Sequence, residues 1–248
     1  MADPKPALQT ASHDGGKVII ALDVPRADDA RSIVDELGGH VGAFKIGSQL
    51  FTAAGPAFVK ELTSNGVKVF LDLKFHDIPN TVANAGISAA RLGVWMFNIH
   101  ASGGSEMMKR TADAVHEVCQ EETLRAPLII GVTVLTSSDD NVLAEVGVGS
   151  GVDRQVVRLA RLAGAAGLDG VVASAREVQL LRSEIADKNL CIVTPGIRAT
   201  SATRNDQRRV TTVGTALAAG ANYVVIGRPV TQADDRTSAL RSMLETGE

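Results

Sequence analysis

The chain has 248 residues, of which 45% are hydrophobic, and its formal net charge is −3. This length and composition suit one large α/β domain. The near-neutral charge and the 3% aromatic content give no reason to expect nucleic-acid binding. No apolar run reaches membrane-spanning length, so we expect no membrane partner.

Compartment and domain limits follow from a few further features. Cys119 and Cys191 form neither a disulfide framework nor a metal-ligand pattern, which fits a reducing compartment. Residues 1–16 contain prolines and polar residues without the apolar core of a signal peptide. We therefore expect a cytoplasmic protein with a flexible N-terminal tail at 1–16 and a catalytic domain at 17–248.

Strand and helix patterns alternate along that domain. Apolar runs predict eight strands, at residues 17–23, 41–47, 67–74, 94–100, 128–135, 170–173, 190–194 and 223–227. Amphipathic stretches predict helices that include residues 27–37, 56–65, 80–92, 105–121, 153–166, 175–185 and 206–219, and a last helix that ends near 245. Eight such units are typical of a single-domain (β/α)8 TIM barrel, with its active site at the C-terminal rim of the strands.

An open, doubly wound sheet is the alternative fold, because its strands and helices alternate in the same way. Such sheets commonly carry a Gly-x-Gly-x-x-Gly fingerprint after a strand, and no strand here is followed by that spacing. The pattern therefore favours the barrel.

The third predicted strand ends in an unusual group of ionisable residues. Asp72 and Lys74 are two positions apart and so share one face of the strand, and His76 and Asp77 follow in the loop. Pro79 and Asn80 then open a helix, with Asn80 as its expected cap. A structural ion pair would also give this spacing, but catalytic groups gather where parallel strands end.

Other polar residues occupy the same position on other strands. The ends of strands one, two, four, five, seven and eight carry Asp23, Lys45, Asn98 with His100, Thr136 with Ser137, Arg198, and Gly227 with Arg228. Glycine allows close approach to the backbone and arginine binds two oxygens at once, so the last pair predicts a phosphate site. We expect His100 to orient a loop by hydrogen bonding, and Asp23, Thr136 and Ser137 are also plausible helix or loop caps.

With these residues identified, the chain resembles the bacterial type of the orotidine 5'-phosphate decarboxylase family. The resemblance covers residues 18–240, and its most specific element is Asp-Leu-Lys-Phe-His-Asp-Ile-Pro-Asn-Thr at 72–81. Shorter elements in the same order are Ala-Leu-Asp at 21–23, Phe-Lys-Ile-Gly at 44–47, His-Ala-Ser-Gly-Gly at 100–104, Thr-Pro-Gly-Ile-Arg at 194–198 and Ile-Gly-Arg-Pro at 226–229.

The resemblance implies the conversion of orotidine 5'-phosphate to uridine 5'-phosphate and carbon dioxide, the last step of de novo pyrimidine nucleotide biosynthesis. It implies a catalytic array of Lys45, Asp72, Lys74 and Asp77, with Lys74 as proton donor and with no metal or cofactor. It implies substrate contacts by Asp23, Lys45, Thr81, Thr136, Ser137, Arg198, Gln207, Gly227 and Arg228. It also implies a homodimer with shared active sites, in which Asp77 and Thr81 reach the partner's site.

Two other functions remain open from the sequence. A sugar-phosphate decarboxylase or aldolase-like synthase on the same barrel would use Mg²⁺ beside its carboxylates. A non-catalytic barrel would bind uridine 5'-phosphate without turnover, although a group of buried charges is costly to keep for binding alone.

Overall fold

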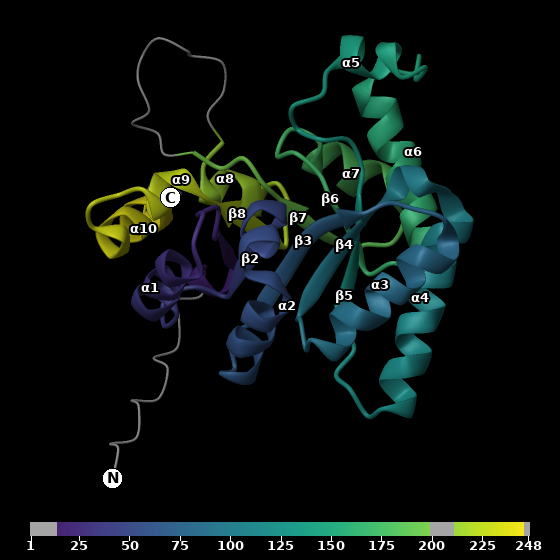
Figure 1. Cartoon of the computed structure of the whole chain (residues 1–248). Coiled ribbons are helices and arrows are strands. Elements are labelled where there is room, and N and C mark those ends of the chain that lie inside the picture. Colours follow the sequence, from purple (N-terminus) through teal and green to yellow (C-terminus); the bar gives the residue numbers. More distant parts are fainter. Residues whose placement is uncertain (1–13, 199–210, 246–248) are drawn as a thin grey trace.

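The protein forms a closed barrel of parallel strands surrounded by helices (Figure 1). This computed structural model describes residues 14–198 and 211–245, so Gln207 and residues 1–13 of the predicted tail at 1–16 lie outside the described residues. Neighbouring strands pair in the order of the chain, and β8 closes the barrel on β1. The strands are β1 (Val18–Ala21), β2 (Ala43–Gly47), β3 (Val69–Phe75), β4 (Met96–His100), β5 (Leu128–Val132), β6 (Gly170–Val172), β7 (Cys191–Thr194) and β8 (Tyr223–Ile226). The predicted single-domain (β/α)8 barrel is confirmed.

Helices follow the strands and cover the outside of the barrel (Figure 1). The longer ones are α1 (Ala27–Leu37), α2 (Ser48–Ser64), α3 (Pro79–Arg91), α4 (Gly104–Glu121), α6 (Val152–Ala165), α7 (Val178–Glu184) and α10 (Arg236–Glu245). The shorter ones are the 3-10 segments η1 (Gly15–Lys17) and η2 (Ala101–Gly103), and the helices α5 (Asp140–Glu145), α8 (Val213–Ala218) and α9 (Arg228–Thr231). In the described part of the chain, no helix is long and apolar enough to cross a membrane.

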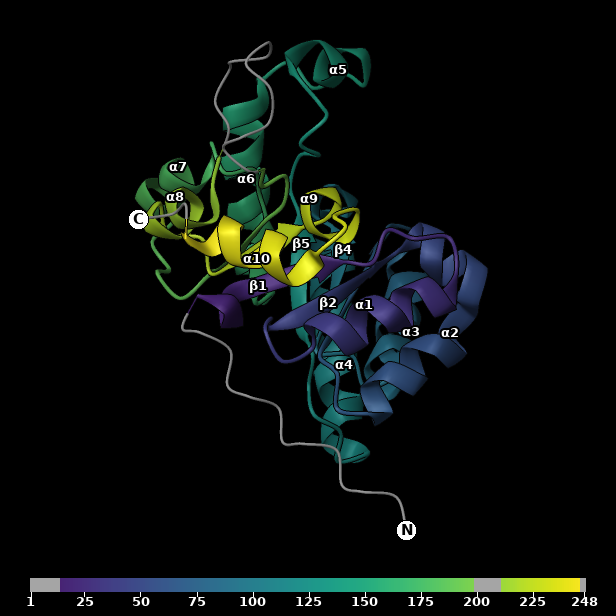
Figure 2. The same cartoon turned by 90° about the vertical axis from the view of Figure 1, so that its left-hand side faces the viewer.

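Helix α1 shows how the sequence produces this arrangement. Two aspartates in its first turn suit the positive end of the helix dipole. Its apolar residues recur at helical spacing and are buried against the barrel, at Ala30, Ile33, Val34 and Leu37. The last helix, α10, lies beside α1 (Figure 2), and Arg236 Nη1 donates to Glu36 Oε2 over 2.6 Å. This contact therefore links the first α-helix of the described fold to the last one.

The apolar core has two layers, one on each side of the strands. The larger layer lies between strands and helices, and the smaller one fills the barrel interior with residues such as Ile19, Ala43, Phe70, Met96 and Ile130. Because side chains alternate along a strand, the residue two positions after an interior residue also points inward, one layer nearer the mouth. That rule places polar residues directly above the apolar floor.

The structure corrects or extends three details of the predicted elements. Asn80 does not cap α3, because Pro79 has a fixed φ and already occupies the first helical position. The side chain of Asn80 instead accepts a hydrogen bond from Arg110 Nη2. Helix α2 starts well before residue 56 and contains a break at Gly55, whose φ is 70°. Helix α5 lies in a connection for which the sequence predicted no structure.

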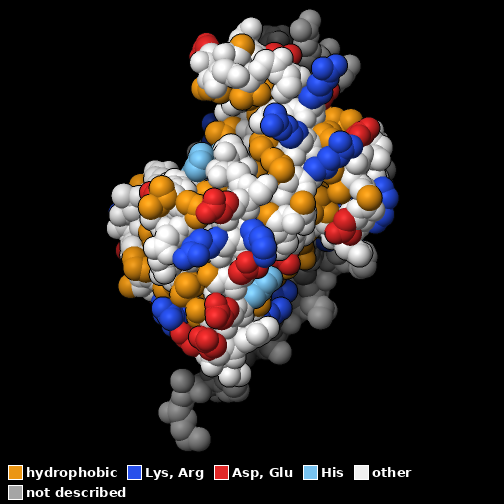
Figure 3. Space-filling model, turned by 90° about the vertical axis from the view of Figure 1, so that its right-hand side faces the viewer, with side chains coloured by type: hydrophobic (Ala, Val, Ile, Leu, Met, Phe, Trp, Pro, Cys, Tyr) orange, Lys and Arg blue, Asp and Glu red, His pale blue; other side chains and the backbone are white. Residues whose placement is uncertain are grey.

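The loops that follow the strands lie at one end of the barrel. Figure 1 shows α5 standing away from the barrel at the end where the strands finish. The face that carries α4 and α6 shows basic, acidic and apolar side chains next to one another (Figure 3). The polar residues predicted at the strand ends face the end of the barrel on which α5 stands.

Candidate active site

An ion pair at the mouth of the barrel forms the centre of the site. Lys45 on β2 follows the interior residue Ala43 by two positions, and Asp72 on β3 follows Phe70 in the same way. Their side chains therefore project into the barrel above its apolar floor, and Lys45 Nζ lies 3.1 Å from Asp72 Oδ2. Both side chains are nearly buried, with 11% and 12% of their surface exposed.

Lys74 completes this group from the end of β3. Its Nζ lies 2.6 Å from Asp72 Oδ1, so each oxygen of that carboxylate faces one ammonium group. The Lys74 side chain is 35% exposed, which leaves it open to a ligand in the mouth. The sequence prediction that Asp72 and Lys74 meet is confirmed by these distances.

The pKa of the Asp72 carboxyl shows which influence prevails. Burial raises this pKa, whereas the charges of Lys45 and Lys74 and the hydrogen bonds from Lys74 and Asn98 lower it. The net result is a pKa below the usual value of an aspartate. Asp72 therefore remains ionised at neutral pH although it is buried.

Asn98 is a residue whose place in this group the sequence did not reveal. It lies on β4, is only 1% exposed, and donates from Nδ2 to Asp72 Oδ1 over 2.7 Å. Its Oδ1 accepts a hydrogen bond of 2.8 Å from the backbone N–H of Lys74. Its position at a strand end was visible in the sequence, but its two partners depend on the local path of β3.

Asp23 and Gly227 border the array on the side of β1 and β8. Lys45 Nζ lies 3.2 Å from Asp23 Oδ1, and the Asp23 side chain is half exposed. A Cβ atom on Gly47 would lie 3.2 Å from Lys45 Nζ, so this glycine leaves room for the ammonium group. A Cβ atom on Gly227 would lie 3.8 Å from Asp23 Oδ2, and Arg228 follows it, exposed, as the first residue of α9.

Asp77 and Thr81 are not joined to the array within this chain. Both are exposed, and Asp77 Oδ1 accepts a hydrogen bond of 2.6 Å from the backbone N–H of Ile78. Ile78 itself is 66% exposed, which is unusual for a large apolar side chain. This exposed segment leads from β3 into α3 beyond the barrel rim.

The two histidines of this region lie beside the array. The rings of His76 and His100 are tilted with centroids 5.5 Å apart. Burial lowers the pKa of His100, and the nearby His76 and Lys74 lower it further, against the opposite influence of Asp72. Folding therefore favours the neutral form of His100.

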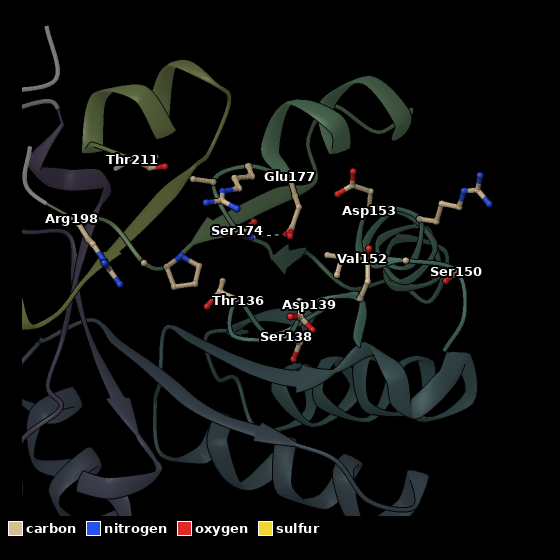
Figure 4. A pocket seen from close by; sticks show the side chains of 17 residues that line it. Thr136, Ser138, Asp139, Ser150, Val152, Asp153, Ser174, Glu177, Arg198 and Thr211 are labelled. Atoms are coloured by element: carbon tan, nitrogen blue, oxygen red, sulfur yellow. Dashed lines mark hydrogen bonds between the residues drawn. The ribbon is translucent and has the colours of Figure 1, made fainter. Parts of the chain in front are cut away.

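A polar cleft of about 770 Å³ opens between the loops that follow β5, β6 and β7 (Figure 4), and none of Lys45, Asp72 and Lys74 lines it. Thr136 and Arg198 line it, and both are exposed. On its far side Glu177 accepts a hydrogen bond from the backbone N–H of Ser174. Ser137 is exposed next to Thr136 but does not line the cleft. Among residues 14–198 and 211–245, no cluster of three His, Cys, Asp or Glu side chains is placed to hold a metal ion.

Comparison with known proteins gives a consistent result. The family model described as "Orotidine 5'-phosphate decarboxylase / HUMPS family" matches residues 16–243. The orotidine 5'-phosphate decarboxylase of Syntrophotalea carbinolica is 51% identical over 92% of this chain and 93% of its own. That of Moorella thermoacetica is 50% identical over 93% of this chain and 92% of its own. The crystal structure of orotidine 5'-phosphate decarboxylase from Lactobacillus acidophilus superposes with a TM-score of 0.79 at 36% identity, over 93% of this chain and 98% of that one.

The family match covers almost the whole barrel, including each strand that carries a residue of the charged array. The curated relatives match over nearly their full length, so the likeness is not limited to one motif. The resemblance inferred from residues 72–81 is therefore confirmed, and this chain belongs to the orotidine 5'-phosphate decarboxylase / HUMPS family.

Proposed function

We propose that this enzyme converts orotidine 5'-phosphate to uridine 5'-phosphate and carbon dioxide, without a cofactor, as the last step of de novo pyrimidine nucleotide biosynthesis. The observation that carries the proposal is the array of Lys45, Asp72 and Lys74 above the apolar floor of the barrel. Loss of carbon dioxide leaves an electron pair on a pyrimidine carbon that has little means of delocalising it. Preorganised charge in a site shielded from water is the form of stabilisation that such a reaction needs.

Lys74 is the proton donor in this proposal. As the bond to the carboxylate carbon breaks, its electron pair stays on the ring carbon, and a proton moves from Lys74 Nζ to that carbon. The ammonium group, held 2.6 Å from Asp72 Oδ1, also stabilises the negative charge before the transfer. One side chain thus supplies both charge and proton.

Asp72 has a complementary part. Its carboxylate remains charged because two ammonium groups lower its pKa. A substrate carboxylate bound nearby would be repelled in the ground state, and the repulsion falls as that charge leaves with carbon dioxide. An interaction that is less unfavourable in the transition state than in the ground state increases the rate.

The remaining residues bind the rest of the substrate in this proposal. Asp23 and Lys45 contact the ribose, Thr136 and Ser137 lie near the pyrimidine, and Gly227 and Arg228 hold the phosphate. Arg198 contributes from the loop after β7, and Gln207 is assigned to the phosphate from the resemblance alone. Arg198 lines the cleft and Arg228 is exposed beside Gly227, so both guanidinium groups are accessible to an anion.

We further propose that two copies of the chain share their active sites. Asp77 and Thr81 are exposed beyond the rim, next to the exposed apolar side chain of Ile78, and this favours contact with a second copy. Each site would then combine Lys45, Asp72 and Lys74 of one chain with Asp77 and Thr81 of the other.

Mixing an inactive Lys74→Ala chain with an inactive Asp77→Ala chain tests this arrangement. In a mixed dimer one site collects both defects and the other has none, so activity returns to about half per mixed dimer by two-fold counting. If subunit exchange is confirmed and no activity returns, each site belongs to a single chain.

The decarboxylation itself is tested by the loss of ultraviolet absorbance of orotidine 5'-phosphate. We expect turnover by the natural chain and its collapse in Lys74→Ala. Lys68→Ala is the matched control, because Lys68 is exposed just before β3, at the opposite end of the same strand. No turnover by the natural chain would refute the proposed reaction, and near-normal turnover by Lys74→Ala would remove Lys74 from the role of proton donor.

A further inference from the structure

The backbone at Lys74 departs from the regular path of a strand. Its φ is 52°, in the left-handed region, which is uncommon for a residue other than glycine, asparagine or aspartate. The four steps from Leu71 to Phe75 on β3 face only the two steps from Phe97 to Ile99 on β4. Residues in this interval are therefore removed from the regular ladder, and the strand bulges at Lys74.

The Asn98 side chain takes the place of the missing ladder contact. The backbone N–H of Lys74 donates to Asn98 Oδ1 over 2.8 Å. This bond determines the orientation of the amide, because an N–H donor requires the oxygen on that side. The Nδ2 group then faces Asp72 Oδ1 at 2.7 Å, and a carboxylate oxygen is a suitable acceptor.

Both hydrogen bonds of Asn98 support the contact between Lys74 and Asp72. Asp72 Oδ1 accepts from both Asn98 Nδ2 and Lys74 Nζ, while Oδ2 faces Lys45. Asn98 thus holds the backbone of Lys74 with one end of its amide and the partner of the Lys74 ammonium with the other. Because Asn98 is 1% exposed, water has little access to replace it.

We infer that Asn98 is a positioning residue of the reaction: it holds Lys74 in a strained backbone conformation and sets the place of its ammonium group against Asp72. Strained backbone persists only where the surroundings determine it, and such sites are concentrated at functional centres. The inference rests on the proposed function of Lys74. It predicts that loss of the amide acts on turnover more than on substrate binding, because the ribose and phosphate contacts lie elsewhere.

The test compares Asn98→Leu and Asn98→Asp with the natural chain on orotidine 5'-phosphate. Asn98→Leu has a similar volume without either hydrogen bond, and we expect kcat to fall about 10- to 100-fold, with a much smaller change in KM. Thr111→Val is the matched control, because Thr111 is fully buried on α4 and loses a single hydrogen bond, to Met107 O. Its kcat should remain that of the natural chain.

Asn98→Asp separates positioning from a general structural effect. The introduced carboxylate still accepts from the Lys74 N–H but faces the Asp72 carboxylate without a proton to donate. The other titratable groups of this region, among the described residues, are Asp23, Lys45, Lys74, His76 and His100. When the introduced carboxyl is protonated at lower pH, the donation to Asp72 returns, so kcat of Asn98→Asp relative to the natural chain should rise as pH falls.

Three results would overturn the inference. The first is an Asn98→Leu enzyme with kcat within about twofold of the natural value, well below the loss expected for these bonds. The second is a pH profile of Asn98→Asp parallel to that of the natural chain, and this profile decides the question if Asn98→Leu fails to fold. If the natural chain itself does not decarboxylate the substrate, crystal structures of the two variants decide instead. Lys74 must then leave its left-handed conformation or lose its contact with Asp72 in at least one variant, and an unchanged geometry in both would refute the role of Asn98.

Discussion

Asp72→Ala provides a test of the array that does not depend on turnover. The substitution removes the partner of Lys45, whose side chain is only 11% exposed. Lys45 keeps a contact with Asp23, but that carboxylate is half exposed and therefore screened by water. Lys74 is more exposed and can be hydrated, so most of the cost comes from Lys45. Removing one member of a buried ion pair costs about 3–5 kcal/mol, and we expect the free energy of unfolding to fall by that amount.

A second substitution in the same background identifies the source of this cost. Lys45→Met replaces the unpaired ammonium group with an apolar chain of similar length, so Asp72→Ala with Lys45→Met should recover most of the lost stability. Lys74→Met in the Asp72→Ala background should recover little, because exposed charges contribute about 0–1 kcal/mol. Urea unfolding at neutral pH measures the free energy of unfolding of the natural chain and of the three variants. Equal recovery by the two methionine substitutions, or an Asp72→Ala cost below about 1 kcal/mol, would contradict the assignment of Lys45 as the buried charge that depends on Asp72.

Three further predictions follow from single sites. Arg228→Ala should weaken the binding of uridine 5'-phosphate by about 1.5–3 kcal/mol while leaving uridine nearly unchanged, and an equal effect on both ligands in calorimetry would remove the phosphate assignment. The pKa of Asp72 is lowered by folding, so its contribution is present above about pH 4 and is lost as pH falls below that value. The free energy of unfolding should therefore fall more between pH 5 and about pH 3 for the natural chain than for Asp72→Asn. Burial raises the pKa of Glu177, so folding favours its protonated form. Glu177→Gln should therefore raise the free energy of unfolding more at pH 7 than at about pH 4. The same gain at both pH values would exclude this linkage.

The fold was predictable because burial follows simple periodicities in this chain. Strand β1 is buried along all four residues, as expected for a parallel strand covered on both faces, and its apolar run is unbroken in the sequence. The period-two rule also placed Lys45 and Asp72 at one mouth of the barrel, in agreement with their distance, and Lys74 reaches the same group although β3 bulges there. Boundaries were less predictable where a single residue decides them, as at Pro79, where the fixed φ starts α3 before Asn80.

The place of Asn98 was not predictable for a different reason. A regular β3 would pair Lys74 through its backbone with β4, and Asn98 would then be one of several polar residues at a strand end. The bulge between Leu71 and Phe75 changes that pairing, and it depends on the left-handed φ of a lysine, which no sequence rule predicts. The sequence therefore identifies the charges of the site, whereas the contacts that orient them require the structure.

The two lysines of the array differ in their charged partners. Lys45 and Lys74 share the Asp72 carboxylate, and Lys45 has a second partner in the half-exposed Asp23. Among the described residues, Asp72 is the one carboxylate that forms an ion pair with Lys74. The apolar layer of Phe70 and Met96 below keeps water from one side, which strengthens the field that the charges direct toward the mouth. An anionic substrate entering there, or an Asp77 carboxylate from a second copy, would meet the open side of the Lys74 ammonium group. In the proposed dimer, the Asp77 carboxylate of the second copy would be a second partner for the Lys74 ammonium group, so the charges on this side of the array would be better balanced.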